Sequence, residues 1–296
     1  MRRSALFAAL LTAACASAPP PAEHTAAPSL AEILDTSPAG DWRAVDPENT
    51  LYMELPGGRV IIELAPEYAP NHAANIRALA RAHYFDGAAI VRSQDNYVVQ
   101  WGRDEGDATS MGEGRPALPP EFDRARAGVQ ITRLPDPDSY ARATGFASGF
   151  PVASNGSRTW LTHCYGMVGA GRGDTADSGS GAELYVVIGQ APRHLDRNIT
   201  VVGRVLRGME VLSVMPRGTG PLGFYEMAQE RTIIGSVRLG TELPASERAN
   251  LEALRTDSAT FDAVIASRRF RRESWFLDPV GHINLCNVPL PVRERR

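Results

Sequence analysis

The sequence YFDGAAIVRSQDNYVVQWG, residues 84–102, carries the clearest structural pattern in the chain. Its runs Ala89 to Arg92 and Tyr97 to Trp101 are rich in valine, isoleucine and aromatic residues, as β-strands are. Gln94-Asp95-Asn96 between them has the polar side chains that favour turns. The pattern therefore predicts two neighbouring strands joined by a tight turn.

The residues before this stretch predict a β-hairpin and a helix. Along TLYMEL (50–55) and RVIIEL (59–64), on either side of Pro56-Gly57-Gly58, apolar residues recur with the period of two that is typical of half-buried strands. From about Pro70 to Arg81 apolar residues recur at helical spacing, and proline suits the first turn of a helix. A hairpin followed by a helix is expected over residues 50–81.

The residues after it predict a loop insertion and then more strands. Residues 103–158 are rich in glycine, proline, aspartate and serine, and predict mostly long loops, which in a compact domain are usually functional or decorative. Many short strands and few helices favour a closed antiparallel barrel or a sandwich. The later strand patterns, all bounded by glycine, are YGMVGAG (165–171), ELYVVIG (183–189), ITVVGRV (199–205) and RTIIGSVRL (231–239).

The pattern changes after Leu243. PASERANLEALR (244–255) and SATFDAVIASRRFRR (258–272) have apolar residues at helical spacing, so residues 243–296 are expected to form a helical C-terminal extension. Its aromatic and apolar residues are more than a disordered tail normally carries. We expect the extension to dock on the rest of the protein, with the insertion at 103–158 as its neighbour.

Composition excludes some classes of function. The chain has 296 residues, 43% of them hydrophobic, and a net charge of −3, which gives no general attraction to nucleic acid or anionic lipid. It contains no lysine, so Schiff-base chemistry and a P-loop lysine are both excluded.

The N-terminus is typical of an exported protein. Arg2 and Arg3 precede a short apolar run, residues 4–14, as in a signal peptide, and the run is too short to span a bilayer. LTAAC (11–15) resembles a bacterial lipobox, with Cys15 as the lipidated residue; cleavage after Ala18 is the alternative. Residues 1–15 are then the signal peptide and 16–47 a proline-rich spacer. We expect the protein on the periplasmic side of the envelope, lipid-anchored, at the outer membrane.

The cysteines agree with export. Without Cys15, the remaining pair is Cys164 and Cys286, an even number in an oxidising compartment. The two could form a disulfide bridge or remain separate buried thiols, and the sequence leaves both alternatives open.

Four segments together resemble one family. Residues 84–102 resemble the cyclophilin signature, in which F/Y-x-G-x-x-F-H-R is followed by a turn, an aromatic residue and Q-G-G. RVIIELAPEYAPNHAANIRALA (59–80), YGMVGAGRGDTADSGSGAELYVVIG (165–189) and HLDRNITVVGRVLRGMEVL (194–212) resemble later blocks of that family in the same order. The chain is similar to cyclophilin-type peptidyl-prolyl cis-trans isomerases from Thr50 to about Leu239.

The resemblance implies a fold and a set of site residues. The fold would be mainly β, a closed eight-stranded antiparallel barrel capped by two helices, over residues 48–242. Arg92 corresponds to the catalytic arginine of the family, Gln100 to its active-site glutamine and Tyr97 to a pocket phenylalanine. The residues implied to bind substrate are Val98, Gly171, Arg172, Glu183, Leu184, Tyr185, His194, Leu195 and Ile199.

The implied activity is rotation about X-Pro bonds of envelope proteins, which assists their folding. No metal or cofactor is required in this family, and the partners are proline-containing flexible or unfolded segments. Some positions depart from the family: His194 replaces a cyclosporin-binding tryptophan, Ile199 a histidine or tyrosine, and Glu183 a glutamine. These bear on rate and sequence preference more than on fold.

The sequence is compatible in part with three alternative functions. The first is a non-catalytic cyclophilin-like binding or chaperone module, which the departures favour and the retained Arg92 and Gln100 oppose. The second is a serine hydrolase, suggested by LTHC (161–164) and DSGSG (177–181), but the separation of these segments is too short for that architecture. The third is a barrel that binds a small molecule, which the filled interior of the family's barrels opposes.

Overall fold

The structure, a computed structural model, describes residues 27–273 and 275–295. The proposed signal peptide, Cys15 and the start of the spacer lie outside the described residues. The largest sheet has nine strands, and each neighbouring pair is antiparallel. In order across the sheet these are β14 (Thr232–Ile233), β4 (Ala89–Ser93), β5 (Val98–Gly102), β12 (Leu184–Val187), β11 (Met167–Ala170), β13 (Val201–Arg207), β3 (Gly58–Leu64), β2 (Thr50–Leu55) and β15 (Ser236–Leu239).

The two edge strands of this sheet follow each other in the chain, with only Ile234 and Gly235 between them. The Ile234 amide donates to the Ala88 carbonyl at 2.8 Å, next to β4, and the Gly235 amide donates to the Glu54 carbonyl of β2 at 2.9 Å. The sheet therefore curls round on itself. The expected closed eight-stranded barrel is corrected to an open order of nine strands, because β14 and β15 continue one another and do not pair.

The inside of the curled sheet is the main hydrophobic core. Alternate residues of each strand point into it, for example Ile90 on β4, Trp101 on β5 and Val186 on β12, each at most 1% exposed. Helix α2 (Pro70–Arg81) covers this core with Ile76 and Leu79. The short helix α3 (Met209–Ser213) buries Leu212 there as well. The outward-facing residues of β4, β5 and β12 are left to form a surface.

The insertion at 103–158 is more ordered than its composition predicts. Its residues supply β6 (Arg124–Ala125), β7 (Thr132–Leu134), β8 (Ala143–Ala147) and β9 (Phe150–Ser154), which form a five-stranded sheet with β10 (Arg158–Leu161). Ser148 and Gly149, both with positive φ, make the two-residue turn between β8 and β9. The strands were missed because β9 is buried on both faces and includes Pro151, so no alternation appears in its sequence.

The C-terminal extension is only partly helical, which corrects the expected helical extension. Residues 251–254 form strand β16 (Leu251–Leu254), which lies between β1 (Trp42–Ala44) and β17 (Val292–Glu294). The predicted helix near 258–272 is present as α4 (Ala259–Phe270), capped by the Ser258 hydroxyl. Apolar residues at 251 and 254 fit a helix by spacing, but all four residues of β16 are buried, so tertiary pairing decides the structure.

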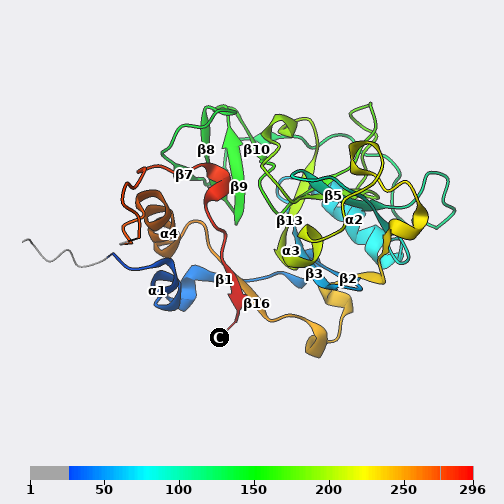
Figure 1. Ribbon diagram of the computed structural model, residues 1–296, viewed down its shortest axis with the longest axis horizontal. Coiled ribbons are helices and arrows are strands. Elements are labelled where there is room, and N and C mark those ends of the chain that lie inside the picture. Colours follow the sequence, from blue (N-terminus) through cyan, green and yellow to red (C-terminus); the bar gives the residue numbers. More distant parts are fainter. Residues whose placement is uncertain (1–26, 274, 296) are drawn as a thin grey trace, which may run out of the picture.

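A second hydrophobic core joins the extension to the insertion. On α4, Phe261 packs edge-on against Phe146 of β8, with ring centroids 5.0 Å apart. The N-terminal helix α1 (Leu30–Asp35) packs against the same core, and Figure 1 shows α1 and α4 together, at the opposite end of the molecule from α2. A disulfide joins Cys164, at the end of the insertion sheet, to Cys286 in the extension. The extension is thus docked on the insertion.

Candidate active site

Arg92 lies on the outer surface of the nine-stranded sheet. It pairs in register with Gln100 across β4 and β5, and its Nη1 donates to the Gln100 Oε1 at 3.1 Å. Its Nε donates to the Leu222 carbonyl at 2.7 Å, and its Nη2 donates to Gln94. Partial burial lowers the pKa of Arg92, opposed by Tyr97 and Glu183, but a guanidinium stays protonated at neutral pH. The side chain is therefore a fixed cation with its fork held in one orientation.

Two aromatic rings cover the Arg92 guanidinium. Its central carbon lies 5.4 Å from the ring centroid of Tyr97 and 5.1 Å from that of Phe224. Phe224 and Leu222 were missed by the sequence analysis. They are about 130 residues from Arg92 in a loop after α3, and no local pattern connects them to it.

Gln100 joins the arginine to a second group of predicted residues. Its Nε2 donates to the Glu183 carboxylate, and only 8% of the residue is exposed. Glu183 lies against Gly171, where a Cβ would meet the Glu183 carboxyl carbon at 3.1 Å, so a larger residue there would displace the end of the Glu183 side chain. Arg172 extends from there to the Asn198 carbonyl at 2.9 Å. The structure thus places Gln100, Glu183 and Gly171 with Arg172 side by side.

An apolar cluster lies beside Arg92. Val98, Tyr185 and Val187 are buried in it, and Tyr97 and Ile199 pack against them. The ring of His194, which is exposed, stacks on Tyr97 with centroids 6.5 Å apart. We call this cluster, together with the His194 ring, the apolar pocket, after the role that the family resemblance implies for it.

Two predicted residues need comment. Leu184 lies in the main core and is 1% exposed, because strand alternation turns it inward while Tyr185 turns outward; its placement in the pocket was wrong. Leu195 is half-buried in a short 3-10 turn, Arg193–Leu195, next to His194.

The back of the apolar pocket is polar. The Tyr185 hydroxyl lies 2.8 Å from His163 Nε2, and His163 Nδ1 lies 3.0 Å from an Asp196 oxygen. Burial raises the pKa of Tyr185 well above its ordinary value, helped by Tyr97 and Asp196. Tyr185 therefore stays protonated across the physiological range. In the sequence, LTHC (161–164) suggests only a hydrolase motif that its spacing rules out, so no local pattern predicts this contact.

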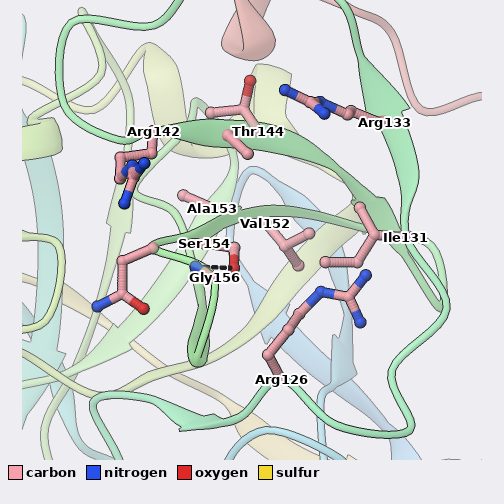
Figure 2. Close-up of a pocket in the computed structure, with 11 residues that line it drawn as sticks. Arg126, Ile131, Arg133, Arg142, Thr144, Val152, Ala153, Ser154 and Gly156 are labelled. Atoms are coloured by element: carbon pink, nitrogen blue, oxygen red, sulfur yellow. Dashed lines mark hydrogen bonds between the residues drawn. The ribbon is translucent and has the colours of Figure 1, made fainter.

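A separate cavity of about 580 Å³ lies on the insertion sheet, and none of the predicted site residues lines it. Figure 2 shows Arg126, Arg133 and Arg142 at its edges, with Ile131 and Val152 between them. Within the described residues, no cluster of three histidine, cysteine or acidic side chains is arranged to hold a metal ion. In the same part of the chain, no helix is long and apolar enough to cross a membrane.

The side chains on the Arg92 surface define a class of protein. They offer fixed hydrogen-bond donors, an acceptor and an apolar pocket on the outside of a curled β-sheet. Such a surface can bind an extended peptide and stabilise a twisted amide without a covalent step. The fold and site are those of a non-covalent isomerase of prolyl peptide bonds.

Comparison with known proteins gives the family. The family model for "Cyclophilin type peptidyl-prolyl cis-trans isomerase/CLD" matches residues 50–234. The "Probable peptidyl-prolyl cis-trans isomerase" of Brucella suis is 28% identical over 176 residues, which cover 60% of this chain and 76% of that protein. The crystal structure of cyclophilin AquaCyp293 from Hirschia baltica matches 85% of this chain and 92% of its own, with 26% identity and a TM-score of 0.65. The chain belongs to the cyclophilin-type family and is a peptidyl-prolyl cis-trans isomerase.

Proposed function

We propose that this isomerase acts on X-Pro bonds in flexible segments of bacterial envelope proteins and assists their folding, with Arg92 as the group that lowers the rotation barrier. The observation that carries the proposal is the Arg92–Gln100 pair, in register beside the apolar pocket. The disulfide between Cys164 and Cys286 supports an oxidising compartment such as the periplasm. A lipid anchor at Cys15 would keep the protein at the outer membrane.

The chemistry requires no bond to break. Rotation about an X-Pro bond crosses a barrier of about 18–20 kcal/mol because amide resonance is lost in the twisted state. The prolyl nitrogen then regains its lone pair, and a donor aimed at it binds the twisted amide better than the planar one. Arg92 would supply this donor, already oriented by its contacts to Leu222, Gln94 and Gln100.

The remaining residues would hold the substrate on either side of the rotating bond. The prolyl ring would fill the apolar pocket between Tyr97, Val98 and Tyr185. The Gln100 amide would donate to a substrate carbonyl, in exchange for its present bond to Glu183. Gly171 and Arg172 would line the groove next to it.

The test is a protease-coupled isomerase assay on a proline tetrapeptide. Arg92→Ala should lower kcat/KM by about 100-fold or more, because one lost preorganised donor costs about 2.7–4 kcal/mol. Arg59→Ala is the matched control: Arg59 is also a partly exposed strand arginine over a tyrosine ring, Tyr52 at 5.4 Å, but on β3. The control should keep full activity.

Equal activity of wild type and folded Arg92→Ala would remove Arg92 from the mechanism. A wild type that binds the peptide without accelerating isomerisation would favour the binding-module alternative.

A further inference from the structure

A chain of buried polar side chains leads from the apolar pocket into the insertion. Beyond the Tyr185–His163–Asp196 contacts, Arg193 Nε donates to Asp196 at 2.5 Å. The two terminal nitrogens of Arg193 donate to both oxygens of Asp138, at 3.0 and 3.2 Å. In this hydrogen-bonded network, the side chains other than that of Tyr185 are 1–7% exposed: His163, Asp196, Arg193 and Asp138. The hydrogen-bonded network is continuous and shielded from water.

The direction of the hydrogen bond between His163 and Asp196 follows from the groups at its two ends. Carboxylates only accept, so His163 Nδ1 carries the proton and donates to Asp196. The Tyr185 hydroxyl, which can both donate and accept, completes the hydrogen-bonded series at His163 Nε2. The position of the tyrosine ring is therefore fixed from behind by the histidine, and the histidine by the aspartate.

The same anchor holds a second wall of the pocket. Arg193 and Asp196 belong to the segment 193–199, which also contributes His194, stacked on Tyr97, and Ile199, packed against the cluster. Fixing Arg193 and Asp196 therefore fixes both pocket residues of this segment. The same hydrogen-bonded network therefore orients the Tyr185 ring and positions His194 and Ile199.

Asp138 comes from outside the nine-stranded sheet. It lies in the loop between β7 and β8 of the insertion, and Tyr140 from the same loop covers the Arg193 guanidinium at 5.3 Å. Burying an arginine is expensive unless its donors are satisfied, and apolar residues often stabilise a core equally well. What a bidentate ion pair adds is a defined geometry.

We propose that Asp138 is a positioning residue for the isomerisation: through Arg193, Asp196 and His163 it holds Tyr185 and the segment 193–199 in the geometry that receives the prolyl ring. The insertion would thus act on the site without touching the substrate. The proposal rests on the assignment of the apolar pocket to that ring.

The matched variants are Asp138→Asn and Asp136→Asn. Asp136 lies two residues away, its side chain is 5% exposed against 4% for Asp138, and it also accepts two bonds from one arginine, Arg269 at 2.8 Å. Arg269, however, belongs to α4, away from the pocket. Both variants should lower the melting temperature, but only Asp138→Asn should raise KM, by about threefold to tenfold, with kcat within about twofold.

A double-mutant cycle tests whether Asp138 affects peptide affinity through the hydrogen-bonded network that ends at Tyr185. Tyr185→Phe removes the hydroxyl that contacts His163 and keeps the aromatic ring. If Asp138 acts through it, the effect of Asp138→Asn on peptide affinity should shrink in the Tyr185→Phe background, whereas that of Asp136→Asn should be the same in both. If Asp138→Asn does not fold, Asp138→Glu, which keeps the charge and displaces it, takes its place in the cycle.

An unchanged KM for Asp138→Asn, or an equal rise in KM for Asp136→Asn, would overturn the positioning role. Additive effects of Asp138 and Tyr185 would overturn the route through Tyr185. The affinity is measured by titration with the unlabelled proline tetrapeptide, so the cycle does not depend on turnover. An isomerase rate that is independent of Arg92 would instead overturn the proposed function and leave this cycle readable.

Discussion

Arginine performs several distinct tasks in this chain, which contains no lysine. Arg92 has no carboxylate partner within the described residues and is held by neutral acceptors, so its charge is available to a ligand. Arg193 is neutralised by two aspartates, and Arg204 by Glu63 at 3.2 Å. The planar fork makes each geometry definite, which an ammonium group would not do.

The Glu63 site should control acid stability. Glu63 is 5% exposed and also accepts from Arg43 at 2.6 Å. Although burial alone would raise the pKa of Glu63, Arg204 and Arg43 lower it below 4.5. A lowered pKa in the folded state means that the charged form contributes stability above the unfolded value, and that this contribution is lost as pH falls through the folded value.

Glu63→Gln should therefore lower the free energy of unfolding at pH 7 by about 3–5 kcal/mol, because Arg204 stays buried without its partner. It should also flatten the loss of stability below pH 4.5. Urea denaturation from pH 7 to pH 3 measures both, with Glu54→Gln as the control. Glu54 pairs with Arg59 on the surface at 40% exposure, so its loss should cost less than about 1 kcal/mol. Parallel pH curves for wild type and Glu63→Gln would contradict the assignment.

How far single residues could be predicted depended on their separation in sequence. Arg92 and Gln100 are eight residues apart across one hairpin, so one local segment with the family spacing was enough to predict both. The family resemblance assigned both Leu184 and Tyr185 to the pocket, and the sequence of β12, which is buried on both faces, shows no alternation that separates them. Asp138 and Phe224 approach the site only through tertiary folding, which no local pattern encodes.

At the scale of elements, the nine-stranded sheet followed its sequence closely and the additions to it did not. The hairpin of β2 and β3, helix α2, and β4 with β5 lie where alternation and turn residues predicted them. The insertion strands are held by pairing within their own sheet, and β16 is held by pairing with β1 and β17. Residues of both sheets are buried in the second core. Helix α4 was predictable because an amphipathic helix shows its buried face in its own sequence.

The disulfide should hold the extension to the insertion. It links residues 122 apart, and closing a loop of about 100 residues stabilises a protein by roughly 4.7 kcal/mol in the chain-entropy model. The double variant Cys164→Ser and Cys286→Ser should lose much of this. Trypsin should then cut at Arg268 to Arg272 sooner than in the wild type, as followed by mass spectrometry. Equal cleavage rates would show that packing around Phe261 alone retains the extension.

At the scale of the whole molecule, residues from both ends of the described chain build the second core. Helices α1 and α4 and Trp42 of strand β1 pack in this core with residues of the insertion, and Figure 1 shows α1 and α4 together at the end of the molecule opposite α2. The Arg92 surface belongs to the nine-stranded sheet. The structural match to AquaCyp293 covers 85% of the chain, more than residues 50–234 supply, so the likeness extends into these additions.

The proposed lipid anchor at Cys15 concerns the location of the whole molecule. Protein taken from its native membrane should begin at Cys15 and carry acyl mass, and Cys15→Ala should release it into the periplasmic fraction. Intact-mass spectrometry of the N-terminal peptide decides the matter. A mature chain that begins at Pro19 or later, without lipid, would contradict the anchor and leave simple secretion.

The continuous run from β14 to β15 has a consequence for an isomerase that binds proline-containing peptides. An exposed sheet edge offers unpaired amides and carbonyls to any extended segment, and strand addition there leads to aggregation. In the nine-stranded sheet the edge strands are two and four residues long and continue one another around the curl. A bound peptide therefore finds little backbone to pair with at the edges of this sheet, which lowers the tendency of strand addition to hold it there.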